Sequence, residues 1–190
     1  LEEKEIVTVV SETEYRNPVR CRGAVRAPVM LSQEQQGIVT EVLADYKGGR
    51  PGTYLVHGIT GSGKTEVYME LIAGIVGLGR QAIVLIPEIA LTYQTVNRFT
   101  SRFGDRVSVL HSRLSAGEKY DQCERAKKGE IDIMIGPRSA LFTPFQKLGL
   151  IIIDEEHETS YKSEAMPKYH ARETAQELAV LAGKQAQGRQ

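Results

Sequence analysis

Tryptophan is absent from this chain of 190 residues, and cysteine occurs only twice, as Cys21 and Cys123. The two cysteines lie far apart and form no C-x-x-C pair, so the sequence predicts no zinc site and favours reduced thiols in a cytosol. A charge excess is also lacking, because 24 basic residues balance 24 acidic ones. Any contact with DNA or RNA must therefore come from a local patch. No apolar run approaches the roughly 18 residues that a membrane span needs, and no signal peptide opens the chain, so no membrane partner is expected.

An initiator methionine is missing as well, since the first residue is leucine. The chain ends in a polar stretch, 182–190, without an apolar stripe, and we expect both ends to be cuts through a longer polypeptide. Residues 1–30, with one predicted strand at 5–10, are interpreted as a linker or arm from a preceding region. Residues 31–182 are expected to form one domain, followed by a polar tail at 183–190.

The most informative stretch is Gly58–Thr65, which matches the phosphate-binding loop pattern G-x-x-x-x-G-K-[ST] at every fixed position. Residues 54–57 before it are predicted to form a strand, and residues 66–76 after it a helix. Glycines let backbone N–H groups converge on an anion, and the start of a helix adds the positive end of its dipole. Lys64 can then reach the outer phosphates, and the hydroxyl of Thr65 can hold magnesium. The sequence therefore predicts a nucleoside triphosphate site, which comprises Gly58, Gly61, Ser62, Gly63, Lys64 and Thr65.

Short apolar runs alternate with helical patterns along the chain. Capping-box patterns at Ser32 and Ser115 open two predicted helices, 33–46 and 116–127, and a third helix is predicted at 90–103. Uniformly apolar strands are typically covered on both faces, as in parallel sheets. The alternation therefore favours an α/β domain with a mostly parallel sheet and helices on both faces. The predicted strands are 82–86, 107–110, 131–135 and 150–153.

Carboxylates follow the last predicted strand as Asp154, Glu155 and Glu156, with His157 behind them. In open α/β sheets, ligands sit beyond the carboxyl ends of the strands, where the phosphate-binding loop also begins. Asp154 is therefore placed to hold magnesium beside Thr65, and Glu155 to orient and deprotonate the attacking water. The alternative for an acidic run at a strand end is a solvated turn. His157, taken alone, also fits a plain surface position.

Residues 154–157 match the D-E-x-H box of superfamily 2 helicases, and other motifs agree in their order. Together the motifs resemble the bacterial primosomal replication-restart helicases, the primosomal protein N′ (PriA) family, from about residue 31 to 182. The match is specific, because generic helicases share the loop and the acid box but not Tyr161-Lys162 or Tyr169-His170-Ala171-Arg172. The segments that carry the resemblance are 87–94 (PEIALTYQ), 111–115 (HSRLS), 136–142 (GPRSALF), 154–162 (DEEHETSYK) and 167–172 (PKYHAR).

This resemblance implies a RecA-like phosphate-loop NTPase lobe, the first of two in an ATP-driven 3′-to-5′ DNA helicase for replication restart and primosome assembly. ATP and Mg²⁺ are the implied cofactors, with zinc only in a C-terminal part that this chain lacks. The implied partners are single-stranded and forked DNA, primosome proteins and single-strand-binding protein, in the bacterial cytoplasm at the nucleoid. An arginine finger from the second lobe is worth about 10³–10⁵ in rate. Without it, the chain is expected to bind Mg-ATP weakly and to hydrolyse it slowly or undetectably.

The resemblance also implies roles for individual residues. Gln35 would read adenine, since a carboxamide both donates and accepts, although Gln35 also fits as the partner of Ser32 in a capping box. His157 would couple the nucleotide state to DNA contacts. Rings and cations after the acid box would stack on bases and hold phosphates, unless the stretch is an ordinary polar loop. The residues assigned to DNA are Arg138, Ser139, Tyr161, Lys162, Lys168, Tyr169, His170 and Arg172.

Two positions depart from the family pattern. Pro137 stands where threonine is common, which removes a hydroxyl and a backbone donor next to Arg138. Tyr93 stands where proline is common, which is expected to alter only the start of a helix. Rival interpretations are a small-molecule kinase, a GTPase or a nucleotide-responsive binding module, but no second-substrate lid and no N-K-x-D guanine motif is seen. Another superfamily 2 translocase, RecG-like or of the restriction type, is disfavoured by the stretch after the acid box.

Overall fold

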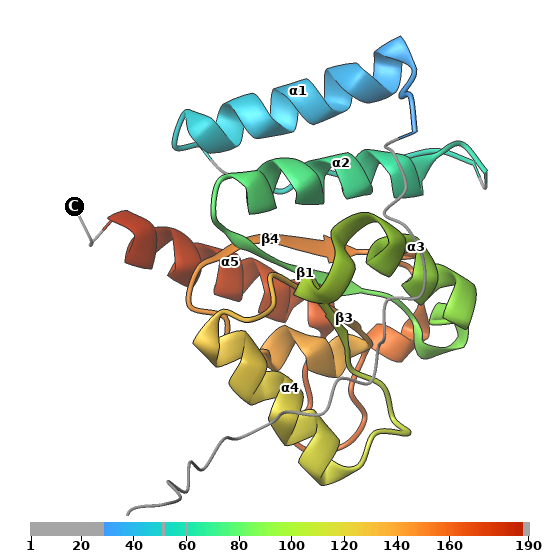
Figure 1. Ribbon diagram of the computed structural model, residues 1–190, viewed down its shortest axis with the longest axis vertical. Coiled ribbons are helices and arrows are strands. Elements are labelled where there is room, and N and C mark those ends of the chain that lie inside the picture. Colours follow the sequence, from blue (N-terminus) through green and yellow to red (C-terminus); the bar gives the residue numbers. More distant parts are fainter. Residues whose placement is uncertain (1–28, 51, 60, 188–190) are drawn as a thin grey trace, which may run out of the picture.

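The computed structural model describes residues 29–50, 52–59 and 61–187. The predicted arm, with its strand at 5–10, lies outside the described residues. The strands are β1 (Gln81–Leu85), β2 (Val107–Val109), β3 (Ile133–Gly136) and β4 (Leu148–Ile153). They form one sheet in the order β2-β3-β1-β4, and every neighbouring pair runs parallel (Figure 1). The predicted α/β fold with a parallel sheet is therefore confirmed.

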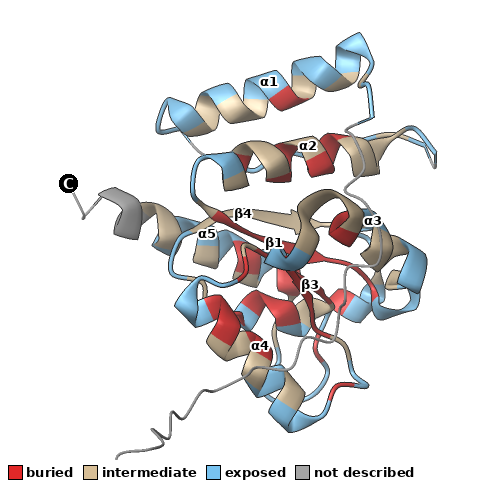
Figure 2. Cartoon of the chain, in the orientation of Figure 1, coloured by how far each residue is buried: buried red, intermediate tan, exposed pale blue. Residues whose placement is uncertain are grey.

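Helices cover both faces of the sheet, as predicted. The α-helices are α1 (Gln33–Lys47), α2 (Lys64–Gly77), α3 (Tyr93–Phe103), α4 (Ala116–Lys128) and α5 (Ala171–Gln187). α2 and α3 pack on one face, α4 and α5 on the other, and α1 lies outside α2 (Figure 1). Every residue of β1 is buried (Figure 2). Its Ala82 and Val84 side chains join the cluster under α2 and α3, while Ile83 and Leu85 join the cluster under α4 and α5.

Local signals explain where these helices begin and end. Ser32 and Ser115 each accept a hydrogen bond from the backbone three residues on, and that residue's side chain bonds back, so both predicted capping boxes are confirmed. α4 ends at Gly129, whose left-handed φ of 74° favours glycine. α3 starts at Tyr93, later than predicted, because the side chain of Thr92 caps it.

One predicted strand is wrong. Residues 54–57, directly before the phosphate-binding loop, are irregular chain without a strand partner, and Leu55 is 82% exposed. β4 pairs with β1 on one side, and no described strand pairs with its other edge. Strand propensity alone does not make a strand, because the segment must also pack its side chains against neighbours.

The sequence pattern predicts a polar tail where the structure has the end of α5. This helix continues through residue 187, so the predicted boundary at 183 falls inside it. The core holds its first turns, since Ala171 and Ala175 are buried one turn apart and Leu178 packs beside them. Buried alanines give a weak amphipathic signal, which explains why periodicity does not predict the helix. No described helix combines the length and the apolar character needed to cross a membrane.

Candidate functional site

The phosphate-binding loop links the irregular segment to α2. Gly61 and Gly63 adopt left-handed φ angles of 82° and 81°, which explains why glycine occupies both positions. A Cβ atom on Gly58 would lie 2.5 Å from the hydroxyl oxygen of Ser62, and one on Gly63 would lie 2.4 Å from Nε2 of Gln35. A side chain at Gly58 or Gly63 would therefore have to displace the Ser62 or the Gln35 side chain.

Lys64, the first residue of α2, folds back over the loop. Its Nζ donates to the carbonyl oxygens of Gly58 at 2.6 Å and of Ile59 at 3.3 Å. The ammonium group thus lies where the loop meets the N-terminus of α2, and the helix dipole favours an anion at the same place. A bound phosphate would compete with the two carbonyls for this cation.

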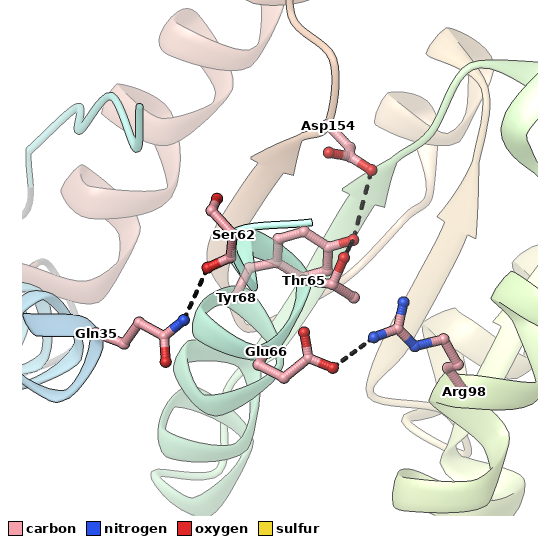
Figure 3. A network of polar contacts seen from close by, with 7 residues as sticks. All are labelled: Gln35, Ser62, Thr65, Glu66, Tyr68, Arg98 and Asp154. Atoms are coloured by element: carbon pink, nitrogen blue, oxygen red, sulfur yellow. Dashed lines mark hydrogen bonds and ion pairs between the residues drawn. The ribbon is translucent and has the colours of Figure 1, made fainter. Parts of the chain in front are cut away.

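Gln35 joins α1 to the loop (Figure 3). Its Nε2 donates to the carbonyl oxygen of Ser62 at 2.9 Å, and its Oε1 accepts from the N–H of Ser32 at 2.8 Å. The capping-box role of Gln35 is therefore confirmed. Recognition of adenine by the same side chain stays a prediction, which its place beside the loop allows.

Asp154 lies directly after β4 and close to the start of α2. Its N–H donates to the carbonyl oxygen of Leu85 at 2.9 Å, which ties it to the end of β1. The hydroxyl of Tyr68 lies 3.4 Å from Oδ2 of Asp154 and 3.3 Å from Oγ1 of Thr65 (Figure 3). The structure thus brings the phosphate-binding loop and the acid box together at one hydroxyl.

The carboxyl group of Asp154 is partly buried, and this burial shifts its pKa. Burial raises the pKa of Asp154, and the negative charge of Glu155 raises it further. A hydrogen bond from the backbone of Glu155, the hydrogen bond from Tyr68 and the positive charge of Lys64 oppose this rise in pKa. Burial also raises the pKa of Tyr68 to about 12, so its hydroxyl keeps its proton at neutral pH. A divalent cation at this place would favour the ionised carboxylate of Asp154.

Thr65 and Asp154 fit a magnesium site. In nucleotide sites Mg²⁺ takes one or two protein carboxylates, while waters and phosphate oxygens fill other positions. A hydroxyl and a carboxylate that meet beside the phosphate-binding loop supply suitable oxygen ligands. Among the described residues, this site included, no group of three or more His, Cys, Asp or Glu side chains is arranged to hold a metal ion.

Glu155 has a left-handed φ of 48°, which is uncommon outside glycine. Sparsely populated backbone conformations of this kind cluster at functional sites. Its carboxylate is exposed and lies 3.8 Å from Nδ1 of His157, which is exposed too. The predicted catalytic base and the histidine predicted to couple nucleotide to DNA are therefore neighbours at the surface.

A pocket of about 520 Å³ lies beyond the carboxyl ends of β1 and β3, over the segments that carry the family motifs. Arg138 and Ser139, both predicted to contact DNA, line this pocket together with Lys119 and Cys123. Two cations, the carboxylate of Glu88 and several hydroxyl residues therefore border a hollow of the size that ligand sites commonly have.

Arg138 also ties the pocket to the stretch after the acid box. Its Nη1 donates to the carbonyl oxygens of Ser160 at 2.7 Å and of Lys162 at 2.8 Å. Tyr161, between these two residues, is only 1% exposed, and its hydroxyl donates to the carbonyl oxygen of Asp154 at 2.6 Å. The prediction that the Tyr161 ring stacks on bases is therefore wrong for this structure, because the ring belongs to the core.

The predicted cations after the acid box lie on the surface. Lys162 pairs with Glu164 at 3.2 Å, and Arg172 pairs with Glu156 at 2.6 Å. Lys168 is exposed as well. Neighbouring carboxylates therefore offset part of the positive charge that the sequence assigns to DNA binding.

The remaining predicted DNA contacts, Tyr169 and His170, are partly buried. The Tyr169 ring packs edge-on against Phe142, with ring centroids 5.3 Å apart. Phe142 is 58% exposed and lines the pocket, so an aromatic pair borders the cavity. Nδ1 of His170 accepts from the N–H of Arg172 at 3.2 Å, which orients the imidazole ring.

Sequence reasoning missed two residues that the structure places at these sites. Tyr68 lies three positions after Thr65, so helical spacing could have indicated that both share one face of α2. Phe142 closes the segment 136–142, and an aromatic residue at the end of a family motif was the available signal.

Known proteins resemble this chain along most of its length. The family described as "Type III restriction enzyme, res subunit" matches residues 28–181. Replication restart protein PriA of Bacillus subtilis (strain 168) is 47% identical over 165 residues, which cover 86% of this chain and 20% of that protein. PriA of Chlamydia pneumoniae is 47% identical over 161 residues, which cover 84% of this chain and 21% of that protein. PriA of Synechocystis sp. is 53% identical over 128 residues, which cover 67% of this chain and 15% of that protein.

The chain thus spans roughly a fifth of the length of these relatives. The resemblance predicted from the motifs is confirmed, and the family match agrees with the RecA-like phosphate-loop fold. The chain therefore belongs to the family of the type III restriction enzyme res subunit, and it is a homologue of replication restart protein PriA over most of its own length.

Proposed function

We propose that this chain is the ATP-binding lobe of a 3′-to-5′ DNA helicase that acts in replication restart and primosome assembly. The observation that carries the proposal is the meeting of Thr65 and Asp154 at one hydroxyl beside the phosphate-binding loop. This arrangement suits a metal-bound triphosphate. Similarity to replication restart protein PriA points to replication restart as the process.

In this proposal the triphosphate lies over the loop, where backbone N–H groups and the N-terminus of α2 stabilise its charge. Lys64 exchanges its two carbonyl contacts for phosphate oxygens. Thr65 and Asp154 hold magnesium, which when bound neutralises charge on the β- and γ-phosphates. Glu155 orients the attacking water and accepts its proton. Gln35 contacts adenine from its place beside the loop.

Single-stranded DNA is proposed to cross the pocket and the stretch after the acid box. Arg138 and Ser139 contact the backbone from the pocket, with Lys119 as an additional cation. The pair of Phe142 and Tyr169 offers an apolar border on which bases can stack. Further contacts to phosphates and bases are assigned to Lys162, Lys168, His170 and Arg172.

His157 is proposed to couple the two sites, because it adjoins Glu155 and lies between the loop and the DNA-facing stretch in sequence. In the complete protein we place this activity in the bacterial cytoplasm at the nucleoid. Its proposed partners are forked DNA, primosome proteins and single-strand-binding protein.

The nucleotide site is tested by Lys64→Ala in the complete protein. We expect DNA-dependent ATP hydrolysis to fall by about 10²-fold or more, since a cation aimed at the phosphates is lost. DNA binding should be retained. Lys47→Ala, at the exposed end of α1, is the matched control and should leave hydrolysis unchanged. Unchanged turnover in Lys64→Ala would rule out the motor.

The DNA site is tested through Cys123, which lines the pocket. In a Cys21→Ser background this thiol is the single cysteine of the chain. We expect a single-stranded oligonucleotide to slow its reaction with a thiol reagent. The matched control carries the cysteine on α1 instead, as Thr40→Cys with both native cysteines replaced by serine. Equal labelling rates of Cys123 with and without oligonucleotide would show that the DNA does not pass over the pocket.

A further inference from the structure

Tyr68 combines a core position with a polar group that packing does not require. It lies on α2 and is 9% exposed. Its ring packs against Phe99 of α3, with centroids 6.2 Å apart and an angle of 15° between the planes. This contact holds the ring in place. Phenylalanine would make the same contact, and a buried hydroxyl is costly unless it finds a partner.

The hydroxyl finds its partners in the nucleotide site (Figure 3). It lies 3.3 Å from Oγ1 of Thr65 and 3.4 Å from Oδ2 of Asp154. One hydroxyl has one proton, and an ionised carboxylate can only accept, so Tyr68 donates to Asp154. The geometry also has Tyr68 as the donor to Thr65, so its one proton is shared between the two oxygens. This arrangement leaves one lone pair of Thr65 Oγ1 and the second oxygen of Asp154 available to a cation.

We propose that Tyr68 is a positioning residue that orients Thr65 and Asp154 before magnesium binds, an inference that rests on the proposed function. Both contacts are longer than the common O–H···O range of about 2.5–3.0 Å, so the hydroxyl guides the two side chains without holding either tightly. Groups that hydrogen-bond to metal ligands fix the orientation of those ligands. Their loss typically lowers metal affinity by about 10–100-fold.

The ring of Tyr68 is itself kept in place by contacts between α2 and α3. Besides the stack on Phe99, an ion pair joins Arg98 of α3 to Glu66 of α2 on the flank of the site (Figure 3). The hydroxyl is therefore carried on a packed ring, and replacing tyrosine by phenylalanine removes the polar contact alone. That makes a conservative test available.

The test is Tyr68→Phe in the 190-residue chain, measured by titration with a fluorescent ATP analogue. We expect affinity for the analogue in EDTA to equal that of the wild type. The magnesium concentration that gives half-maximal enhancement of binding should rise by about 10-fold or more. The thermal unfolding midpoint without ligand should stay close to that of the wild type, because the ring still packs on Phe99.

Tyr54→Phe is the matched control, since it removes another tyrosine–aspartate hydrogen bond, to Asp45 at 2.8 Å, outside the site. It should keep the magnesium dependence of the wild type. The same magnesium dependence in Tyr68→Phe would overturn the inference and leave the proposed function intact. An equal loss of affinity with and without magnesium would also overturn it, because the hydroxyl would then be purely structural. Failure of the complete protein to bind the analogue with magnesium would overturn the proposed function and this inference with it.

Discussion

Gly61 and Gly63 share a backbone conformation but differ in their surroundings. Their φ angles are 82° and 81°, so a side chain at either position is strained. A Cβ atom at Gly61 would meet no atom within 4 Å, whereas one at Gly63 would meet Nε2 of Gln35 at 2.4 Å. The two positions therefore separate the cost of backbone strain from the cost of displacing the Gln35 side chain.

Gly61→Ala should lower the free energy of unfolding by about 1–2 kcal/mol through strain alone. Gly63→Ala should lower it further and should also weaken nucleotide binding, because Gln35 is pushed away from the loop. Urea unfolding and nucleotide titration measure the two effects. Adding Gln35→Ala to Gly63→Ala should remove most of the extra cost. Equal losses in the two single variants would show that the contact with Gln35 is unimportant.

Glu88 ties the segment after β1 to the segment after β2. Its Oε1 accepts from the N–H of Ser112 at 2.9 Å. Hydrogen bonds from the side chain and the backbone of Ser112 hold the pKa of Glu88 below its ordinary value of 4.5. A carboxyl with a lowered pKa stabilises the fold above 4.5, and this stabilisation is lost as the pH falls through the lowered pKa.

Glu88→Gln should therefore lower the free energy of unfolding at neutral pH, by less than about 1 kcal/mol because the group is largely solvated. The difference from the wild type should shrink as the pH falls below 4.5. Urea midpoints at neutral and acidic pH measure it. Glu41→Gln, at an exposed position of α1, should change stability little at either pH. A difference for Glu88→Gln that persists in acid would contradict the charge-based explanation.

The two capping boxes are chemically alike but lie in different parts of the molecule. In α1 the box consists of Ser32 and Gln35, and the same Gln35 side chain reaches Ser62 in the phosphate-binding loop. In α4 the box consists of Ser115 and Glu118. Of these two helices, only α1 has a capping residue that also contacts the phosphate-binding loop.

Ser32→Ala and Ser115→Ala should each lower the free energy of unfolding by about 1 kcal/mol, the usual cost of a lost N-cap. Nucleotide affinity should fall only in Ser32→Ala, since the lost N-cap frays the first turn of α1, which carries Gln35 beside the loop, even though the backbone N–H of Ser32 can still donate to the Gln35 side chain. Thermal unfolding and nucleotide titration of the pair measure the two quantities. Equal affinities would mean that α1 does not position Gln35 for the loop.

The elements differ in how far the sequence predicts them. α2, α4 and the four strands follow local signals, namely caps, apolar runs and glycine at helix ends. Residues 54–57 look like a strand but remain outside the sheet, with Leu55 exposed. α5 looks polar but packs through Ala171 and Ala175. Residues 54–57 lack strand neighbours in spite of their strand propensity, whereas α5 follows its helix propensity and only its buried face was not apparent from periodicity.

At the scale of the molecule, β1 lies between the two hydrophobic clusters, and all of its residues are buried. Ile83→Ala should lower the free energy of unfolding by about 2–5 kcal/mol, because it leaves a cavity in a packed core. Ile89→Ala makes the same change at a position that is 88% exposed and should stay within about 0.5 kcal/mol of the wild type. Urea unfolding compares the two. Similar costs would contradict the assignment of the core.

The chain spans roughly a fifth of the length of its relatives. Its rate of ATP hydrolysis is therefore a property to predict for the chain as a whole. We expect the isolated chain to bind Mg-ATP weakly. It should turn ATP over about 10³–10⁵ times more slowly than a complete protein of the family, if, as the resemblance implies, an arginine finger comes from outside these residues. Steady-state hydrolysis with and without single-stranded DNA measures this. DNA-stimulated turnover at the rate of the complete protein would contradict the expectation.

The sequence by itself determined the phosphate-binding loop, the capping boxes and the acid box, since each depends on residue types at short, fixed spacing. It also determined the parallel α/β class through alternating apolar runs. Only the tertiary structure decided that Tyr68 joins Thr65 to Asp154, that Tyr161 belongs to the core and that Gln35 reaches the loop. These outcomes depend on contacts between residues far apart in the chain. Burial and hydrogen-bond partners are properties of such contacts, which local spacing does not reveal.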